Sequence, residues 1–215
     1  MTWLADNWRT VLDLAVSHLY LAGVPLVLGL VLSVPLGWAA KRWSGTYSTI
    51  ITTTGLLYTI PSLALFVIMP IVLGTKILDP LNVVVAMTIY TVALLVRTVA
   101  DGLRAVPDHI EQAATAMGYR GVRRLFGVEL PLAVPVIASG LRVAAVSNVS
   151  IVSVASLIGV SQLGDLLVDG YNRVIWGELA TGILSCILLA LLLDGAIVLG
   201  TRALTPWVRV QGARG

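Results

Sequence analysis

The sequence contains few charged residues and almost no cysteine. Asp, Glu, Lys and Arg make up only 12% of the 215 residues, about half of what a soluble domain carries. The single cysteine, Cys186, excludes an intramolecular disulfide and a cysteine metal cluster. The two histidines, His18 and His109, do not have the spacing of metal ligands. We therefore expect neither a metal nor another cofactor.

The chain also lacks a glycine-rich phosphate-binding motif. It is therefore not expected to be an enzyme that hydrolyses ATP, and any energy it uses must come from a partner or a gradient. Its net charge of +3 does not indicate nucleic-acid binding, because the basic residues are scattered at the ends of apolar runs. Hydrophobic residues are 58% of the total, which predicts one all-α membrane domain over residues 1–215.

Five apolar runs are long enough to cross a bilayer, which takes about 20 helical residues. The segment before the first run, residues 1–17, is either an interfacial helix or the extended start of the first span. Pro61 and Pro135 are candidate bending points, because each removes a backbone hydrogen bond. The predicted spans are about 18–40, 50–73, 81–100, 131–160 and 179–200.

The distribution of basic residues predicts how the chain is oriented. If the N-terminus is outside, only Arg9, Lys76 and Arg173 are outside, and the inner side receives Lys41, Arg42, Arg104, Arg120, Arg123, Arg124, Arg202, Arg209 and Arg214. Tryptophan is also found at or beyond the predicted span ends, as in an interfacial belt: Trp3, Trp8, Trp38, Trp43, Trp176 and Trp207. We therefore predict a cytoplasmic C-terminus and a cytoplasmic loop at residues 102–130.

That loop has the pattern of a helix with one apolar, mostly small face. Pro107 suits a first helical position, and Gly118 is placed to end the helix in a left-handed cap. A second short helix is predicted from Gly121 to Phe126. The apolar face consists of Ile110, Ala113, Ala114 and Met117, and it suggests a docking surface, although an ordinary polar loop is the alternative.

The loop resembles the "EAA" loop of bacterial ABC-type (type I) importer permeases. Ala113-Ala114, Gly118, Val128 and Leu130-Pro131 match the family's spacing, whereas the position of the family's Glu is occupied by Gln112 and the acid is Glu111. The resemblance implies that an ABC ATPase subunit is coupled through Glu111, Gln112, Ala113, Ala114, Met117, Gly118, Leu130 and Pro131. It also implies a bacterial plasma-membrane protein that pairs with a second permease subunit, the same or different, and receives solute from an extracytoplasmic binding protein.

A second stretch, residues 59–65 (TIPSLAL), resembles permeases of osmoprotectant importers, together with Gly177-Glu178-Leu179. This resemblance implies import of glycine betaine, carnitine or choline. The alternatives are a permease for an amino acid such as methionine, a gradient-driven secondary transporter, or a scaffold that transports nothing.

Several polar residues fall inside the predicted spans, where charge is costly. Arg97, Arg142 and Asp194 are expected to snorkel or to form an ion pair, Asp194 with Arg97 or Arg142. The spaced serines of the fourth span either pack against other helices or line a hydrated path. Tyr58 is either a packing residue or a contact for a quaternary ammonium. The candidate path residues are Tyr58, Ser62, Ser147, Asn148 and Ser150.

Overall fold

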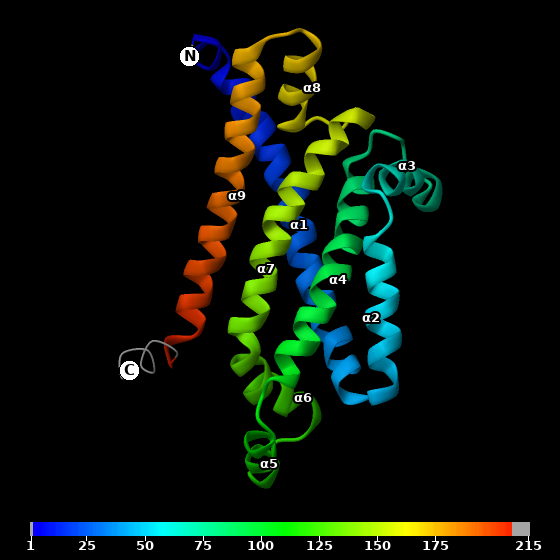
Figure 1. Ribbon diagram of the computed structural model, residues 1–215, viewed down its shortest axis with the longest axis vertical. Helices are drawn as coiled ribbons and strands as arrows, with labels where there is room; N and C mark the ends of the chain where they lie inside the picture. The colour runs from blue at the N-terminus through cyan, green and yellow to red at the C-terminus, as the bar shows by residue number, and fades with distance from the viewer. Residues whose placement is uncertain (1, 208–215) are drawn as a thin grey trace.

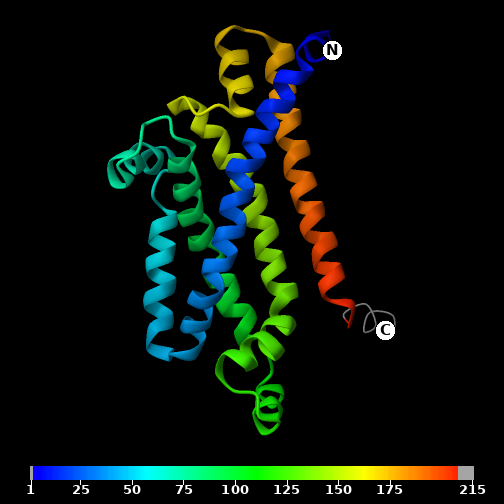
Figure 2. The same cartoon turned by 180° about the vertical axis from the view of Figure 1, so that it is seen from behind.

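The computed structural model describes residues 2–207, which are helical with short connections (Figure 1). The predicted basic residues Arg209 and Arg214 lie outside the described residues. Long helices run side by side along the molecule, and short helices lie at its two ends (Figures 1 and 2). The elements are α1 (Thr2–Arg42), α2 (Ser44–Tyr58), α3 (Ser62–Leu73), α4 (Pro80–Arg104), α5 (Asp108–Ala116), α6 (Gly121–Arg124), the π-helical η1 (Leu125–Glu129), α7 (Leu130–Val152), the 3-10 helix η2 (Ser153–Ile158), α8 (Gly164–Asn172) and α9 (Trp176–Leu204).

Four helical segments are long and apolar enough to cross a membrane: Trp3–Arg42, Pro80–Arg104, Gly121–Ile158 and Trp176–Leu204. They contain the first, third and fifth predicted spans and all but the last two residues of the fourth. α1 is one helix from Thr2 to Arg42, so the N-terminal segment continues the helix of the first predicted span and does not form a separate helix. The all-helical prediction is therefore confirmed for the described residues.

The second predicted span, 50–73, is not one continuous helix. α2 ends at Tyr58, α3 begins at Ser62, and the two are bent by 99°. Pro61 supplies the physical reason, since it has no backbone N–H to donate and disfavours helical geometry in the preceding residue. The hydroxyl of Tyr90, on α4, donates to the Ile60 carbonyl at the break. Pro61 is thus a bending point as predicted, whereas Pro135 lies inside an α7 that continues unbroken from Leu130 to Val152.

α4 is the central helix of the bundle, and it packs against α1, α2, α3 and α7. Glycines allow the closest approaches. A Cβ added to Gly29 of α1 would lie 2.4 Å from Thr91 of α4, and one added to Gly37 would lie 2.6 Å from Val99 of α4. Gly140 of α7 approaches Thr98 in the same way. Small residues at these crossings let the backbones meet, as in other membrane helix pairs.

Two buried polar side chains connect the helices of this core. The amide of Asn148, on α7, donates to Thr91 Oγ1 at 3.0 Å and to the Ala22 carbonyl at 3.2 Å, which joins α7 to α4 and α1. His18 of α1 has one ring nitrogen 2.8 Å from Oε1 of Gln162 and the other 3.0 Å from the Val149 carbonyl. These contacts satisfy polar groups that would be costly to leave unpaired in an apolar interior.

The two ends of the bundle differ in charge. α5 and α6 lie at one end, with the C-terminal ends of α1, α4 and α9, and α8 lies at the other (Figure 1). We call these the α5 end and the α8 end. The described basic residues at the α8 end are Arg9, Lys76 and Arg173, whereas those at the α5 end are Lys41, Arg42, Arg104, Arg120, Arg123, Arg124 and Arg202.

Candidate functional site

The loop of residues 102–130, which we call the coupling loop, contains α5, α6 and η1. It joins α4 to α7, and α5 lies beyond the ends of the long helices (Figures 1 and 2). Pro107 is the residue just before α5 rather than its first helical residue. Gly118 has a φ of +88°, the left-handed conformation predicted from its position. The N–H of Tyr119 donates to the Ala114 carbonyl at 2.9 Å, which closes the end of the helix.

The structure divides the predicted apolar face of α5. Gln112, Ala113 and Gly118 are exposed, and Met117 is 72% exposed. Ala114 is only 1% exposed and therefore faces the interior of the loop. The side chain of Glu111 is 18% exposed and turns toward other charges rather than toward solvent. Leu130 and Pro131 are the first two residues of α7, and Leu130 packs against the buried cluster that contains Val99 and Leu103.

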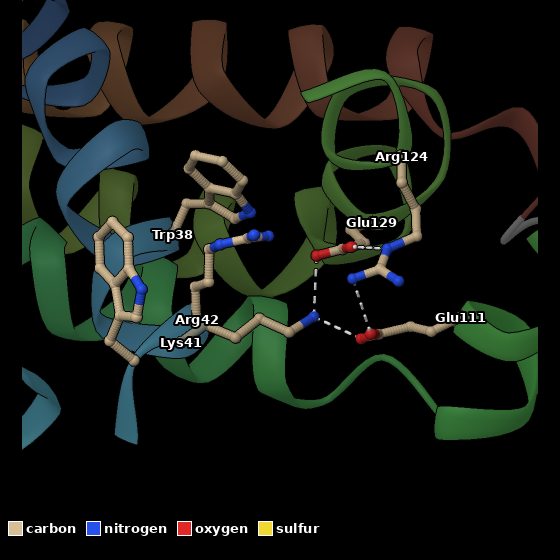
Figure 3. A pocket seen from close by; sticks show the side chains of 7 residues that line it. Trp38, Lys41, Arg42, Glu111, Arg124 and Glu129 are labelled. Atoms are coloured by element: carbon tan, nitrogen blue, oxygen red, sulfur yellow. Dashed lines mark hydrogen bonds and ion pairs between the residues drawn. The ribbon is translucent and has the colours of Figure 1, made fainter. Parts of the chain in front are cut away.

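Four charged side chains form a continuous network beneath α5 (Figure 3). Nζ of Lys41, at the end of α1, lies 2.5 Å from Oε1 of Glu111 and 2.9 Å from Oε2 of Glu129. Nε of Arg124 lies 2.6 Å from Oε1 of Glu129, and its Nη2 lies 3.5 Å from Oε2 of Glu111. We call these four residues the charge network. Each acid contacts both bases, so the network is closed.

The charge network attaches the coupling loop to a membrane helix. Lys41 is 70 residues from Glu111 and 88 from Glu129, so both bonds are tertiary. The Glu129 side chain is 1% exposed and that of Lys41 is 15% exposed, which limits screening by water. Two positive and two negative charges balance each other. The loop is therefore held to the end of α1 by two ion pairs.

Sequence reasoning missed this network. Lys41 and Arg124 were counted only as inner-side charges, and Glu129 was not singled out. The signal that was available is the position of Glu129, an acid directly before a long apolar run, where it needs a partner. Nothing in the sequence identifies which base supplies that partner.

The candidate path residues lie on two separate parts of the bundle. Tyr58 and Ser62 lie on either side of the break between α2 and α3, and the Tyr58 ring packs edge-to-face on Tyr90 with centroids 5.7 Å apart. Ser147 and Ser150 are half-buried and exposed, respectively, on α7. Asn148 is 2% exposed and belongs to the helix core described above.

The charged residues inside the predicted spans include an ion pair, which is one of the two predicted alternatives. Asp194 of α9 pairs with Arg142 of α7, with Nε 2.6 Å from Oδ1 and Nη2 2.9 Å from Oδ2. Arg97 lies elsewhere, on an exposed part of α4. The ion pair with Arg142 is therefore confirmed.

Three comparisons agree with this architecture. The family described as "Binding-protein-dependent transport system inner membrane component" matches residues 26–210. The osmoprotectant import permease protein OsmW of Salmonella typhimurium is 33% identical over 95% of this chain and 96% of its own length. The glycine betaine/carnitine/choline transport system permease protein OpuCB of Bacillus subtilis is 29% identical over 96% and 94%, respectively.

Among solved structures, a chain of the inward-facing MetNI methionine ABC transporter has the same fold. The TM-score is 0.81 with 20% sequence identity, over 93% of this chain and 98% of that one. The family match covers most of the sequence. The chain belongs to the family of inner membrane components of binding-protein-dependent transport systems.

Proposed function

We propose that this permease subunit moves a small quaternary-ammonium osmoprotectant, such as glycine betaine, carnitine or choline, into the cell. The names of the relatives support this solute class, since OsmW and OpuCB are osmoprotectant permeases that match almost the whole chain. The likeness to the methionine transporter supports the fold but not the solute, because identity is only 20%. Partner subunits supply ATP hydrolysis and deliver the solute.

We propose five membrane crossings, with α2 and α3 together as the second. α1 ends at the α5 end and α4 begins at the α8 end, so the chain between them must travel the length of the bundle (Figure 1). α2 provides most of that distance, and α3 lies across it after the 99° bend. An odd number of crossings puts the termini on opposite sides. The excess of basic residues at the α5 end supports a cytoplasmic coupling loop and an external N-terminus.

The observation that carries the coupling proposal is apolar side chains exposed on the coupling loop. Met117 is 72% exposed and Val122 is 57% exposed, on a loop that lies beyond the long helices. Apolar groups exposed to water in this way suggest a protein contact. We propose that they dock on the ATPase subunit, together with Gln112, Ala113 and Gly118. Glu111 and the rest of the charge network then pass the motion to α1, while Ala114, Leu130 and Pro131 hold the loop in shape.

A cysteine at Met117, in a Cys186→Ala background, tests orientation and docking together. A membrane-impermeant thiol reagent should not label it in intact cells but should label it in inside-out vesicles stripped of the ATPase. Adding the ATPase back should slow labelling about tenfold, because the docked surface is covered. Ala114→Cys is the matched control on the same helix, and its buried thiol should stay unlabelled. Labelling of Met117→Cys in intact cells contradicts the orientation, and no protection by the ATPase contradicts docking.

For the solute path we propose Tyr58, Ser62, Ser147 and Ser150. Tyr58 is 39% exposed, so part of its ring is accessible to a cation. An aromatic face attracts a quaternary ammonium by about 0.5–2 kcal/mol. We leave Asn148 out of this path because its amide is bonded inside the helix core.

Uptake by the reconstituted transporter tests the solute. Glycine betaine or choline should be imported with ATP alone, without an ion gradient. Tyr58→Leu should reduce this uptake several-fold, up to about tenfold, whereas Tyr58→Phe should keep it because the ring remains. Equal uptake by the two variants contradicts the cation contact. Import of methionine with no effect of quaternary ammonium compounds contradicts the solute class but leaves the coupling proposal standing.

A further inference from the structure

A charged pair lies exposed near the middle of two membrane helices. Arg142 is twelve residues into α7 and Asp194 is ten residues from the end of α9, which puts both about 15–18 Å from the α5 end of their helices. The exposed fractions of the side chains are 48% for Arg142 and 23% for Asp194. A bilayer core is about 30 Å thick, so the pair lies inside the apolar part of both helices and away from their ends.

Lipid is a poor environment for this pair. Ionisable groups inside a membrane normally face a protein interior or water, because hydrocarbon does not solvate them. The two hydrogen bonds between Arg142 and Asp194 leave other N–H groups and lone pairs of the same side chains unsatisfied by each other. Those groups need water or another polar molecule on the exposed side.

Three serines share this face of α7 with Arg142, between the exposed side chains of Val143 and Val146. Ser139 and Ser150 are exposed and Ser147 is half-buried, and they lie three to five residues apart from Arg142 or from one another, on one side of the helix. The exposed surface of α1 at this depth is different. On α1 the exposed residues are Val27, Leu28, Val31 and Leu32. Exposed polar groups are thus more frequent on this side of α7 than on α1.

The face is also hollow. A cavity of about 390 Å³ lies over it, lined by Ser139, Arg142, Val143, Val146, Ser147 and Asp194. We call this surface, from Ser139 to Ser150 of α7 with Asp194 of α9, the α7 polar face. A helix packed tightly on it would have to fill the hollow and desolvate both charges, which is costly. Water fills such a hollow without that cost.

We propose that the α7 polar face is a wall of the water-filled solute pathway and that it receives small solutes carrying both a positive and a negative charge. Arg142 presents N–H donors to a carboxylate, and Asp194 presents a negative charge to an ammonium group. This inference rests on the proposed import function and adds the surface along which the solute moves.

Thiol labelling in native membranes tests the proposal. Ser147→Cys, and separately Ser139→Cys and Ser150→Cys, are made in the Cys186→Ala background and treated with a small charged methanethiosulfonate. Thiols react as thiolates, which form in water and not in hydrocarbon. Labelling should be at least tenfold faster at these positions than at Val31→Cys of α1. Val31 is 62% exposed and lies at a depth similar to that of Ser139, so it controls for exposure and depth at that position. Val27→Cys, also 62% exposed, is the corresponding control for Ser147, and Tyr20→Cys, 51% exposed, is the control for Ser150. Ala144→Cys, buried on the opposite side of α7, controls for non-specific reaction.

Three positions are tested so that the result does not depend on a single substitution that misfolds the protein. Fast labelling at two of the three supports a water-filled wall. Slow labelling at all three, equal to Val31→Cys, overturns it in favour of lipid. Disulfide cross-linking between copies without reagent labelling also overturns it, because the face would then be a packed interface. Thiol labelling does not require transport. If the proposed solute class is wrong, the uptake assay will show it, and the labelling rates at these positions will be unchanged.

Discussion

Replacing Glu129 with Gln is expected to reduce ATP-driven uptake at least tenfold while the protein stays in the membrane. Glu129 accepts hydrogen bonds from both Lys41 and Arg124, and its side chain is 1% exposed. The neutral amide leaves two positive charges with only Glu111 between them. Removing one partner from a buried ion pair costs about 3–5 kcal/mol. That cost changes the equilibrium constant between the attached and the detached loop by a factor of more than about 100. ATP hydrolysis should continue but no longer drive uptake.

The matched control for this variant is Asp108→Asn. Asp108 is an exposed acid in the first turn of α5, so the substitution makes the same chemical change on the same loop outside the charge network. Uptake and ATPase rates are measured at equal membrane abundance, with limited proteolysis to report loosening of the loop. Glu129→Gln should be cleaved faster than Asp108→Asn. Full uptake by Glu129→Gln would show that the network does not transmit motion.

Replacing Gly29 with Leu is expected to prevent assembly of the bundle. Even a Cβ at this position would lie 2.4 Å from Cγ2 of Thr91, and Leu adds three more carbons. Thr91 cannot simply rotate away, because its hydroxyl bonds the Met87 carbonyl and lies 3.2 Å from Oδ1 of Asn148. Overpacking in a close-packed interior costs about 1–3 kcal/mol or more, and here it also breaks a polar contact. We expect membrane abundance to fall at least fivefold, with aggregation on mild heating in detergent.

Gly195→Leu is the control for adding a large apolar side chain to a membrane helix. Gly195 lies in α9, and a Cβ there would meet no other atom within 4 Å. Its abundance and thermal stability should stay close to those of the unaltered protein. A Gly29→Leu variant as abundant and as stable as Gly195→Leu would mean that α1 and α4 do not meet as closely as the structure places them.

The sequence by itself determined the features that depend on local composition. Length and apolarity of the runs determined that the chain is helical and membrane-embedded, because a bilayer accepts few other structures. Pro61 determined where the second run bends, and Gly118 determined the end of α5, since each imposes backbone geometry on its own neighbourhood. The spacing of Ala113, Gly118 and Pro131 was enough to suggest the family, which the comparisons show.

The tertiary structure decided what depends on residues far apart in the chain. Whether the bend at Pro61 would be slight or 99° depends on how α3 packs on α4, which no local pattern records. The inward position of Ala114 and the interior position of Asn148 depend on which side of a helix meets its neighbours. Lys41, one of the two partners of Glu129, lies 88 residues away, and Arg142, the partner of Asp194, lies 52 residues away, so several bases were equally available from sequence. Only helix packing brings one of them within hydrogen-bonding distance, because a charge in an apolar interior takes the partner that the fold places beside it.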